Sequence, residues 1–207
     1  MGKVNIAKIF GSDVKDIMRL LNSSGKDCYI VGGAVRDLLL QHKELSDIDL
    51  TTPLRVEQLK QIFDINQIKV NDRALKYGSL TIRTQKRSLQ ITSFRKDIQT
   101  FGRSADVAHI ENIEEDAKRR DFTINAFYCS YNGEIIDPLG NLKDLNKKKL
   151  KFIGDPEKRI TEDYLRILRF FRFVAVLDLK NKNIGSNYLP IIKKHLHGLN
   201  ELSDERV

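Results

Sequence analysis

The periodicity of apolar residues changes near residue 140, and this change constrains the fold more than any other feature of the chain. Up to about Pro138, short segments with helical spacing alternate with short apolar runs typical of strands. Beyond that point the spacing is helical, and it is strongest at 161–179. The sequence therefore predicts an α/β head at 1–140, with a mixed sheet flanked by helices, followed by an all-helical neck at 141–207.

The individual elements follow from apolar spacing and turn residues. GSLTIRT and SLQITSF alternate on either side of QKR, which predicts a β-hairpin, and FYCSYNGEIID predicts a strand, a turn and a second strand. Further strands are expected at 28–31 and 47–52, and helices at 12–24, 34–41, 55–63, 113–120, 161–179 and 187–199.

Composition limits the class of protein. The 207 residues include 36 Lys and Arg against 28 Asp and Glu, and the net charge of +8 favours a polyanionic partner such as nucleic acid or nucleotide. Cys28 and Cys129 alone do not make a disulfide framework or a cysteine metal site, and a reducing compartment is expected. Because no apolar run approaches the ~20 residues of a membrane span, we expect a cytoplasmic protein with no membrane contact.

Two carboxylates stand two residues apart in SDIDLTT. Alternate residues of a strand project to the same side, so Asp47 and Asp49 would share one side of the sheet. Such a pair repels itself unless a cation or proton shares the site, and its hard oxygen atoms suit Mg²⁺ with phosphate completing the coordination. The alternative for an isolated pair of this kind is a solvated strand end.

A pair of glycines in VGGAVRD follows an apolar strand and opens a helix. Gly32 and Gly33 permit positive φ and close approach of backbone N–H groups, and a helix N-terminus favours a phosphate. Arg36 lies about one turn into that helix, where it could reach the same anion. The alternative is a plain strand-to-helix turn, which the downstream carboxylates make less attractive.

Two adjacent arginines end the helical run EEDAKRRDFTINA. Arg119 and Arg120 could bind a triphosphate, while Asp121 and Asn125 could accept or donate hydrogen bonds to the hydroxyls of a sugar. The alternative is a helix with basic residues favourably placed near its C-terminus.

The segment TEDYLRILRFFRF has a charged side and an apolar side. At 100° per residue, Glu162, Asp163 and Arg169 lie within roughly 60° of Arg166. The opposite stripe, which we expect to face the core, comprises Tyr164, Ile167, Leu168, Phe171, Val174 and Ala175. The usual meaning of such a charged side is a solvated helix. Phe170 and Phe173 nevertheless fall on it, which suggests a pocket wall.

The Asp163 and Arg166 pair offers a chemical basis for choosing a nucleobase. Cytosine and adenine both present an amino donor beside a ring-nitrogen acceptor, whereas uracil and guanine present a carbonyl oxygen in place of the amino group. An Asp accepts from the amino group and an Arg donates to the ring nitrogen. One Asp–Arg pair can therefore accept C and A while rejecting U and G, and each good bidentate contact contributes about 1–3 kcal/mol of discrimination.

Taken together, these motifs resemble the class II tRNA nucleotidyltransferases, or CCA-adding enzymes, and the related bacterial poly(A) polymerases. The resemblance begins near residue 28, and it is carried by VGGAVRDLLL, SDIDLTT, KYGSLTI, EEDAKRRDFTINAF, DPLGNLKDL, IGDPEKRITEDYLRILRFFRF and ELSDERV. It implies a polymerase-β-like nucleotidyltransferase head and a helical neck. It also implies that C and A are added from CTP and ATP to the 3′ end of tRNA, with release of pyrophosphate.

The resemblance also assigns roles to residues. It implies that Asp47 and Asp49 are catalytic and hold Mg²⁺, and that Asp163 and Arg166 read the base. It further implies nucleotide contacts from Gly32, Gly33, Arg36, Arg119, Arg120, Asp121 and Asn125, with support of the base pocket from Arg169 and Arg172. The helical geometry does not independently support Arg172, which turns about 120° away from Arg166.

Several alternatives stay open from the sequence. Members of this family usually continue for a stretch as long again, forming a body and tail that grip tRNA, whereas this sequence stops within ELSDERV. An engineered fragment, a shortened gene or a split gene with a second polypeptide supplying the body and tail would each produce this ending. The rival functions are partial CC or A addition, poly(A) synthesis, and a catalytically inactive RNA-binding remnant. A magnesium-dependent nuclease would leave the base-reading pair unexplained.

Overall fold

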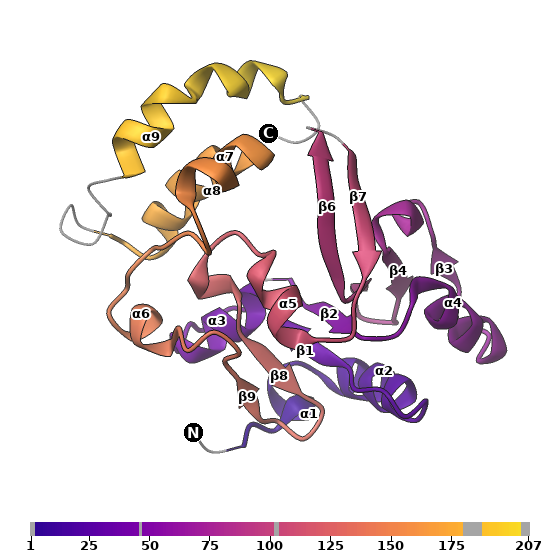
Figure 1. Ribbon diagram of the computed structural model, residues 1–207. Coiled ribbons are helices and arrows are strands. Elements are labelled where there is room, and N and C mark those ends of the chain that lie inside the picture. Colours follow the sequence, from indigo (N-terminus) through magenta and orange to yellow (C-terminus); the bar gives the residue numbers. More distant parts are fainter. Residues whose placement is uncertain (1–2, 46, 102–103, 180–187, 204–207) are drawn as a thin grey trace.

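A seven-stranded mixed sheet forms the centre of the computed structural model, which describes residues 3–45, 47–101, 104–179 and 188–203 (Figure 1). Only β2 and β5 pair in parallel, and the other neighbouring strands are antiparallel. The strands lie in the order β3 (Val70–Asn71), β4 (Ser79–Arg83), β5 (Ser88–Ser93), β2 (Asp49–Thr52), β1 (Tyr29–Val31), β8 (Tyr128–Ser130) and β9 (Ile135–Ile136). This confirms the predicted mixed sheet and both predicted hairpins.

Strand alternation divides the side chains of the sheet between two hydrophobic clusters. Ile30, Leu50 and Cys129 point into the larger cluster, which they share with buried residues of the flanking helices. These helices are α1 (Ile6–Ile9), α2 (Ser12–Asn22), α3 (Gly33–Leu39) and α4 (Val56–Ile65). Val31 and Tyr128 belong to the smaller cluster with Ala117 of α5 (Ile113–Lys118). The side of the sheet that faces α5 is therefore only partly filled by apolar residues.

A two-stranded ribbon that hydrophobic periodicity does not predict stands apart from the main sheet (Figure 1). It consists of β6 (Arg95–Phe101) and β7 (Ser104–His109), which pair in antiparallel fashion. Their sequences, RKDIQTF and SADVAH, contain no regular apolar alternation. Backbone pairing, which any non-proline residue can provide, defines this ribbon.

The segment after residue 140 is helical, as predicted, but its strongest element is interrupted. The helices of this segment are α6 (Leu142–Asn146), α7 (Pro156–Glu162), α8 (Leu165–Val176) and α9 (Tyr188–Lys194), and η3 (Leu196–Glu201) is a 3₁₀ turn. The 3₁₀ turns η1 (Leu75–Tyr77) and η2 (Thr123–Asn125) lie earlier in the chain. The prediction of one helix over 161–179 is wrong, because Asp163 has extended backbone angles (φ −157°, ψ 104°) between α7 and α8. Residues 180–187, and 204–207 of the ELSDERV motif, lie outside the described residues.

The side of α8 that faces the core differs from the predicted stripe. Phe170 and Phe173 are 0% and 4% exposed, whereas Phe171 is 47% exposed. The two buried rings pack against the ring of Phe122 from the head, at centroid distances of 6.3 and 5.4 Å. The predicted core stripe is therefore wrong for Phe171 and Ala175, which are exposed, whereas Ile167 is buried and Tyr164 and Val174 pack partly buried against the larger cluster. Aromatic partners from outside the helix select the side that it buries.

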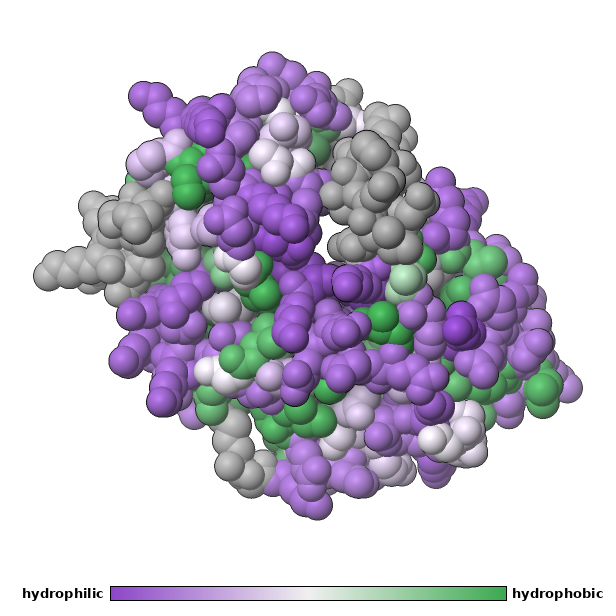
Figure 2. Space-filling model, in the orientation of Figure 1, coloured by the Kyte–Doolittle hydropathy of each residue, from purple (hydrophilic) through white to green (hydrophobic). Residues whose placement is uncertain are grey.

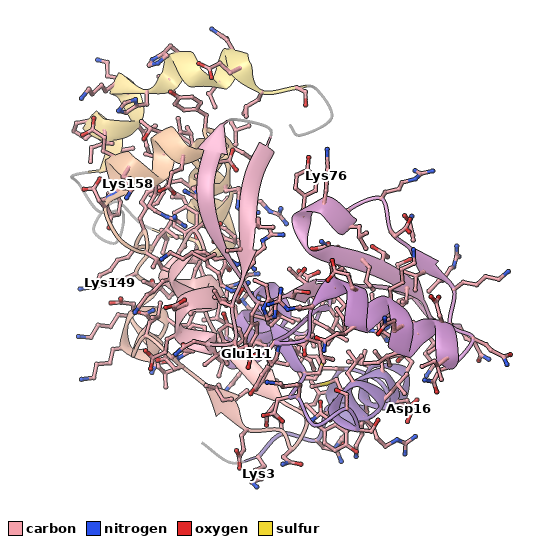
Figure 3. The ribbon with its side chains drawn as sticks, turned by 45° about the vertical axis from the view of Figure 1, so that its right-hand side comes forward. Lys3, Asp16, Lys76, Glu111, Lys149 and Lys158 are labelled. Carbon is pink, nitrogen blue, oxygen red and sulfur yellow. The ribbon has the colours of Figure 1, made fainter. Side chains whose placement is uncertain are left out.

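Head and neck share the larger hydrophobic cluster, which contains Ile30 of β1 as well as Ile167 and Phe170 of α8. The division at residue 140 stays a prediction. Charged side chains such as Lys3, Asp16, Lys149 and Lys158 lie at the periphery (Figure 3). Within the described part of the chain, no helix combines the length and apolar character needed to cross a membrane.

Candidate active site

The two carboxylates of SDIDLTT lie at the beginning of β2. Asp49 is the first residue of the strand and pairs with Val31 of β1, while Asp47 precedes the strand, which starts two residues later than predicted. Both aspartates are exposed, and Ile48 between them is buried in the larger cluster. The alternation therefore directs Asp47 and Asp49 away from that cluster, toward the side of the sheet that carries α5.

The electrostatics of Asp49 reflect its position between anionic and cationic groups. Desolvation by the surrounding protein raises the pKa of Asp49, the charge of Arg120 lowers it, the charge of Asp47 raises it and Arg169 lowers it, with a net upward shift. Asp47 and two arginines from distant parts of the sequence thus lie within electrostatic range of Asp49. A divalent cation would relieve the repulsion between the two carboxylates.

The donor atoms fit Mg²⁺ better than a softer metal. Asp47 and Asp49 supply only carboxylate oxygens, which Mg²⁺ prefers, and Mg²⁺ usually completes its coordination with water and substrate phosphate. Among the described residues, no group of three or more His, Cys, Asp or Glu side chains could hold a metal by itself. The pair therefore fits a metal that arrives with a phosphorylated substrate.

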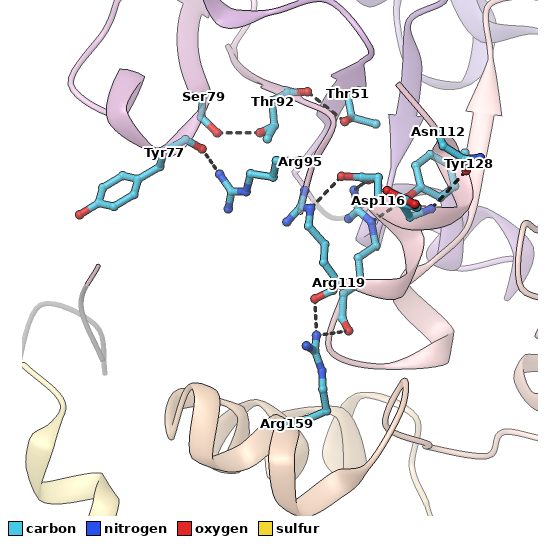
Figure 4. Close-up of polar contacts among 12 residues, drawn as sticks. Thr51, Tyr77, Ser79, Thr92, Arg95, Asn112, Asp116, Arg119, Tyr128 and Arg159 are labelled. Atoms are coloured by element: carbon cyan, nitrogen blue, oxygen red, sulfur yellow. Dashed lines mark hydrogen bonds and ion pairs between the residues drawn. The ribbon is translucent and has the colours of Figure 1, made fainter. Parts of the chain in front are cut away.

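Arg119 and Arg120 follow the end of α5 and converge on one buried carboxylate. Arg119 Nε donates to Asp116 Oδ1 at 2.7 Å, and Arg120 Nη2 donates to Asp116 Oδ2 at 2.9 Å. The hydroxyl of Tyr128 donates to the same Oδ2 at 2.7 Å (Figure 4). Sequence reasoning missed Asp116, although its spacing of three and four residues from the arginines is a detectable signal.

Arg159 of α7 is a second residue that the sequence analysis did not select. Its Nη2 atom donates to the carbonyl oxygens of Arg119 and Arg120, the latter at 2.7 Å (Figure 4). These carbonyls lie at the C-terminal end of α5, where helices leave acceptors without an intrahelical partner. Arg159 therefore links the neck to the backbone that carries both arginines.

The turn formed by Gly32 and Gly33 agrees only in part with the predicted phosphate-binding turn. Gly32 has positive φ (+77°) and precedes α3, which begins at Gly33. The N–H of Gly32 donates to the carbonyl of Phe127 at 3.2 Å, so this group stabilises the sheet rather than facing a ligand. Arg36 is 5% exposed, with Nε donating to Asp37 Oδ1 and Nη1 to Asn125 Oδ1, each at 2.8 Å.

Asp121 and Asn125 continue this buried network toward the neck. Asn125 Nδ2 donates to Asp121 Oδ1 at 3.1 Å, and Arg169 Nε donates to Asp121 Oδ2 at 2.6 Å. Burial favours the neutral acid, but the Arg169 charge and the hydrogen bonds outweigh it and lower the pKa of Asp121. The structure thus brings Arg36, Asp121, Asn125 and Arg169 together, although the sequence placed them in three separate motifs.

The predicted base-reading residues lie at the break between α7 and α8. Asp163 Oδ1 accepts from the backbone N–H of Leu165, the first residue of α8, at 3.1 Å. Arg166 is 7% exposed, and its Nη1 donates to Glu162 Oε2 at 2.8 Å and to the carbonyl of Arg159 at 2.5 Å. Arg172 is exposed on α8. Hydrophilic residues dominate the face drawn in Figure 2.

Comparisons with known proteins agree with this arrangement. The family described as the Poly A polymerase head domain matches residues 28–151. The human mitochondrial CCA tRNA nucleotidyltransferase 1 is 36% identical over 200 residues, which cover 96% of this chain and 46% of the relative. The CCA-adding enzyme of Streptococcus uberis is 37% identical over 192 residues, covering 92% of this chain and 46% of the relative.

Solved structures give the same result. The Bacillus stearothermophilus CCA-adding enzyme in complex with CTP has a TM-score of 0.78 and 32% identity, covering 93% of this chain and 45% of its own. A tRNA nucleotidyltransferase complexed with a primer tRNA and an incoming ATP analogue has a TM-score of 0.69 and 30% identity, covering 93% and 53%. The chain spans about half the length of these relatives.

Proposed function

We propose that this chain, which belongs to the family of class II tRNA nucleotidyltransferases and bacterial poly(A) polymerases, carries the catalytic part of a CCA-adding enzyme. It would transfer C and A from CTP and ATP to the 3′ end of tRNA and release pyrophosphate. The observation that carries the proposal is that Asp49 lies in one row across the sheet with Tyr128, whose hydroxyl accepts from Arg120. The charges of Arg120 and Arg169 also act on the Asp49 carboxylate. The relatives with CTP, or with primer tRNA and an ATP analogue, support these substrates.

The reaction would be an in-line attack by the RNA 3′-hydroxyl on the α-phosphate of the nucleotide. Mg²⁺ held by Asp47 and Asp49 would lower the pKa of that hydroxyl and balance the charge on the leaving pyrophosphate. Arg120 would hold the triphosphate, because it lies within electrostatic range of Asp49 on the same side of the sheet. Catalysis would then depend on positioning and charge stabilisation without a covalent enzyme intermediate.

We propose further that Asp163 and Arg166 select cytosine and adenine. Asp163 lies at the break between α7 and α8, and Arg166 lies one turn before Arg169, whose guanidinium binds Asp121. The Nη1 atom of Arg166 binds Glu162, which holds the guanidinium in one orientation. Asp163→Ala should relax base choice more than it slows nucleotide transfer. An equal loss with all four nucleotides would exclude a base-reading role.

The test supplies each of the four NTPs separately, with Mg²⁺, to three RNAs. These are tRNA ending before CCA, tRNA ending in CC, and an unstructured RNA. We expect C to be added to the first tRNA and A to the second, and Asp47→Asn or Asp49→Asn to abolish both. Low salt is appropriate because RNA contact by a basic protein of this size weakens steeply with salt.

The same experiment separates the alternatives. Addition of A alone to the unstructured RNA would indicate poly(A) synthesis, which the description of the matching head-domain family also favours. Folded protein that binds RNA but adds no nucleotide would indicate an inactive RNA-binding remnant. Addition of C without A would indicate a partial CC-adding enzyme.

A further inference from the structure

We infer that Asp116 and Tyr128 are positioning residues that orient Arg120 toward the triphosphate of the nucleotide, an inference that rests on the proposed function. The three side chains form one hydrogen-bonded group. Arg120 Nε donates to the Tyr128 hydroxyl at 3.0 Å, and that hydroxyl donates to Asp116 Oδ2 at 2.7 Å. Arg120 Nη2 donates to the same Oδ2 at 2.9 Å, which closes the ring of contacts.

These contacts fix the plane of the guanidinium. The carbon at the centre of the Arg120 guanidinium lies 5.2 Å from the centroid of the Tyr128 ring, so the group is held by stacking as well as by hydrogen bonds. Tyr128 is itself immobilised, because it is fully buried and its ring contacts those of Tyr29 and Phe94 edge-on. The buried Tyr128 side chain therefore holds the Arg120 guanidinium in a fixed position.

The remaining nitrogen of Arg120 is the one that faces the glycine turn. Among the described residues, Nε and Nη2 have the partners given above and no hydrogen bond reaches Nη1. A Cβ atom placed on Gly32 would lie 3.9 Å from Nη1, so this donor points to the beginning of α3. An anion beside Gly32 could therefore accept a hydrogen bond from Arg120 Nη1 without a rearrangement of that side chain.

The sheet places this donor near the carboxylates. Asp49 pairs with Val31, and Val31 pairs with Tyr128 on its other side, so the three residues form a row across β2, β1 and β8 on one face. Two strand spacings separate Asp49 from Tyr128, roughly 10 Å. Arg120 contacts Tyr128 of β8, which lies two strands away from Asp49 of β2. An extended triphosphate could span this separation.

The charges of the group also favour an anion. The carboxylate of Asp116 is fully buried and has two cationic partners, with Arg119 on Oδ1 and Arg120 on Oδ2. One negative charge therefore faces two positive charges, which leaves a net positive charge beside the site.

The test measures binding of inorganic tripolyphosphate with Mg²⁺ by calorimetry, because this probe has no base or ribose. Tyr128→Phe removes one hydroxyl, and we expect its dissociation constant to rise about 5- to 10-fold, within the range that the net contribution of a typical hydrogen bond predicts. Tyr29→Phe is the matched control, since the Tyr29 ring belongs to the same aromatic group as Tyr128. The Tyr29 hydroxyl donates to Asp27. We expect that variant to bind as the wild type does.

A double-mutant cycle distinguishes orientation from general support. In an Arg120→Lys background, which lacks the planar guanidinium, Tyr128→Phe should have less than a 2-fold further effect. Equal effects in both backgrounds, or a lower melting temperature with unchanged tripolyphosphate binding, would overturn the inference. Asp116→Asn serves as a second variant if Tyr128→Phe does not fold, and the same loss of binding is expected.

The binding measurement also keeps this inference separate from the proposed function. Wild-type protein that binds tripolyphosphate but adds no nucleotide to any RNA would contradict CCA addition and leave the role of Tyr128 testable. Wild-type protein that does not bind tripolyphosphate would contradict the inference, whatever its activity.

Discussion

Arg169 on the neck helix contacts a single oxygen, Oδ2 of Asp121, twice at 2.6 Å, with Nε donating a hydrogen bond and Nη2 forming an ion pair. The two residues are 48 positions apart in the sequence. Asp121 continues the network through Asn125 to Arg36 of α3. The helix that carries the candidate base-reading residues is thereby attached to the helix that follows the glycine turn.

Asp121→Asn should lower the free energy of unfolding by about 1–3 kcal/mol, measured by urea denaturation. Loss of one partner leaves a cation beside a neutral amide in a buried network, which costs about 3–5 kcal/mol when the pair is fully buried. The side chain of Arg169 is 38% exposed, so water screens part of that cost. Asp16→Asn is the control, because its pair with Arg19 is exposed at the periphery (Figure 3). Equal effects of the two substitutions would contradict the network.

Phe173→Leu should destabilise the protein by about 1–3 kcal/mol, whereas Phe171→Leu should change stability by less than about 0.5 kcal/mol. Phe173 contacts the ring of Phe122, and the guanidinium groups of Arg36 and Arg169 lie 5.2 and 5.5 Å from its centroid. Phe171 is 47% exposed on the other side of α8. Thermal unfolding of the two variants compares them directly, and a larger effect at Phe171 would restore the side predicted from the sequence.

Asp116→Asn should remove part of the loss of stability at low pH. Burial raises the pKa of Asp116, but the charges of Arg120 and Arg119 outweigh it and hold this pKa at about 2, below the ordinary value of 3.8. A lowered pKa stabilises the fold above the unfolded value of 3.8, and this stabilisation is lost as the pH falls toward 2. The shift corresponds to about 2 kcal/mol.

Urea denaturation gives the free energy of unfolding at each pH between 5 and the lowest pH at which the protein refolds. We expect the wild type to lose about 2 kcal/mol more than Asp116→Asn over this range. Asp72→Asn is the control, because Asp72 pairs with Lys60 on the surface, where solvent screens the interaction. A steep acid dependence that persists in Asp116→Asn would assign it to other carboxylates.

Mg²⁺ added with CTP should raise the melting temperature of the wild type above that with CTP alone, and Asp49→Asn or Asp47→Asn should abolish that further increase. The reason is linkage, since a ligand that binds the folded state alone stabilises it in proportion to its affinity. Asp64→Asn, at an exposed position of α4, should retain the increase. An unchanged response to Mg²⁺ after loss of either candidate ligand would place the metal elsewhere.

Much of the fold and part of the site could be predicted from local pattern. The hairpin of β4 and β5 and the positions of β1 and β2 follow from apolar alternation and turn residues, as does the projection of Asp47 and Asp49 opposite Ile48. Each of these depends on residues within one element, where the geometry of the chain fixes the spacing. The sequence by itself therefore determined these elements of the head and the side of the sheet toward which Asp47 and Asp49 project.

The tertiary structure alone decided the distant partners of Arg36 and Arg169. Asn125 as the partner of Arg36 lies 89 positions away, and Asp121 as the partner of Arg169 lies 48 positions away. The burial of Phe173 in place of Phe171 likewise follows from packing of the neck against Phe122. Helical periodicity defines the sides of α8, but the side that becomes buried depends on the shape and charge of the surface it meets, and only the folded chain assembles that surface.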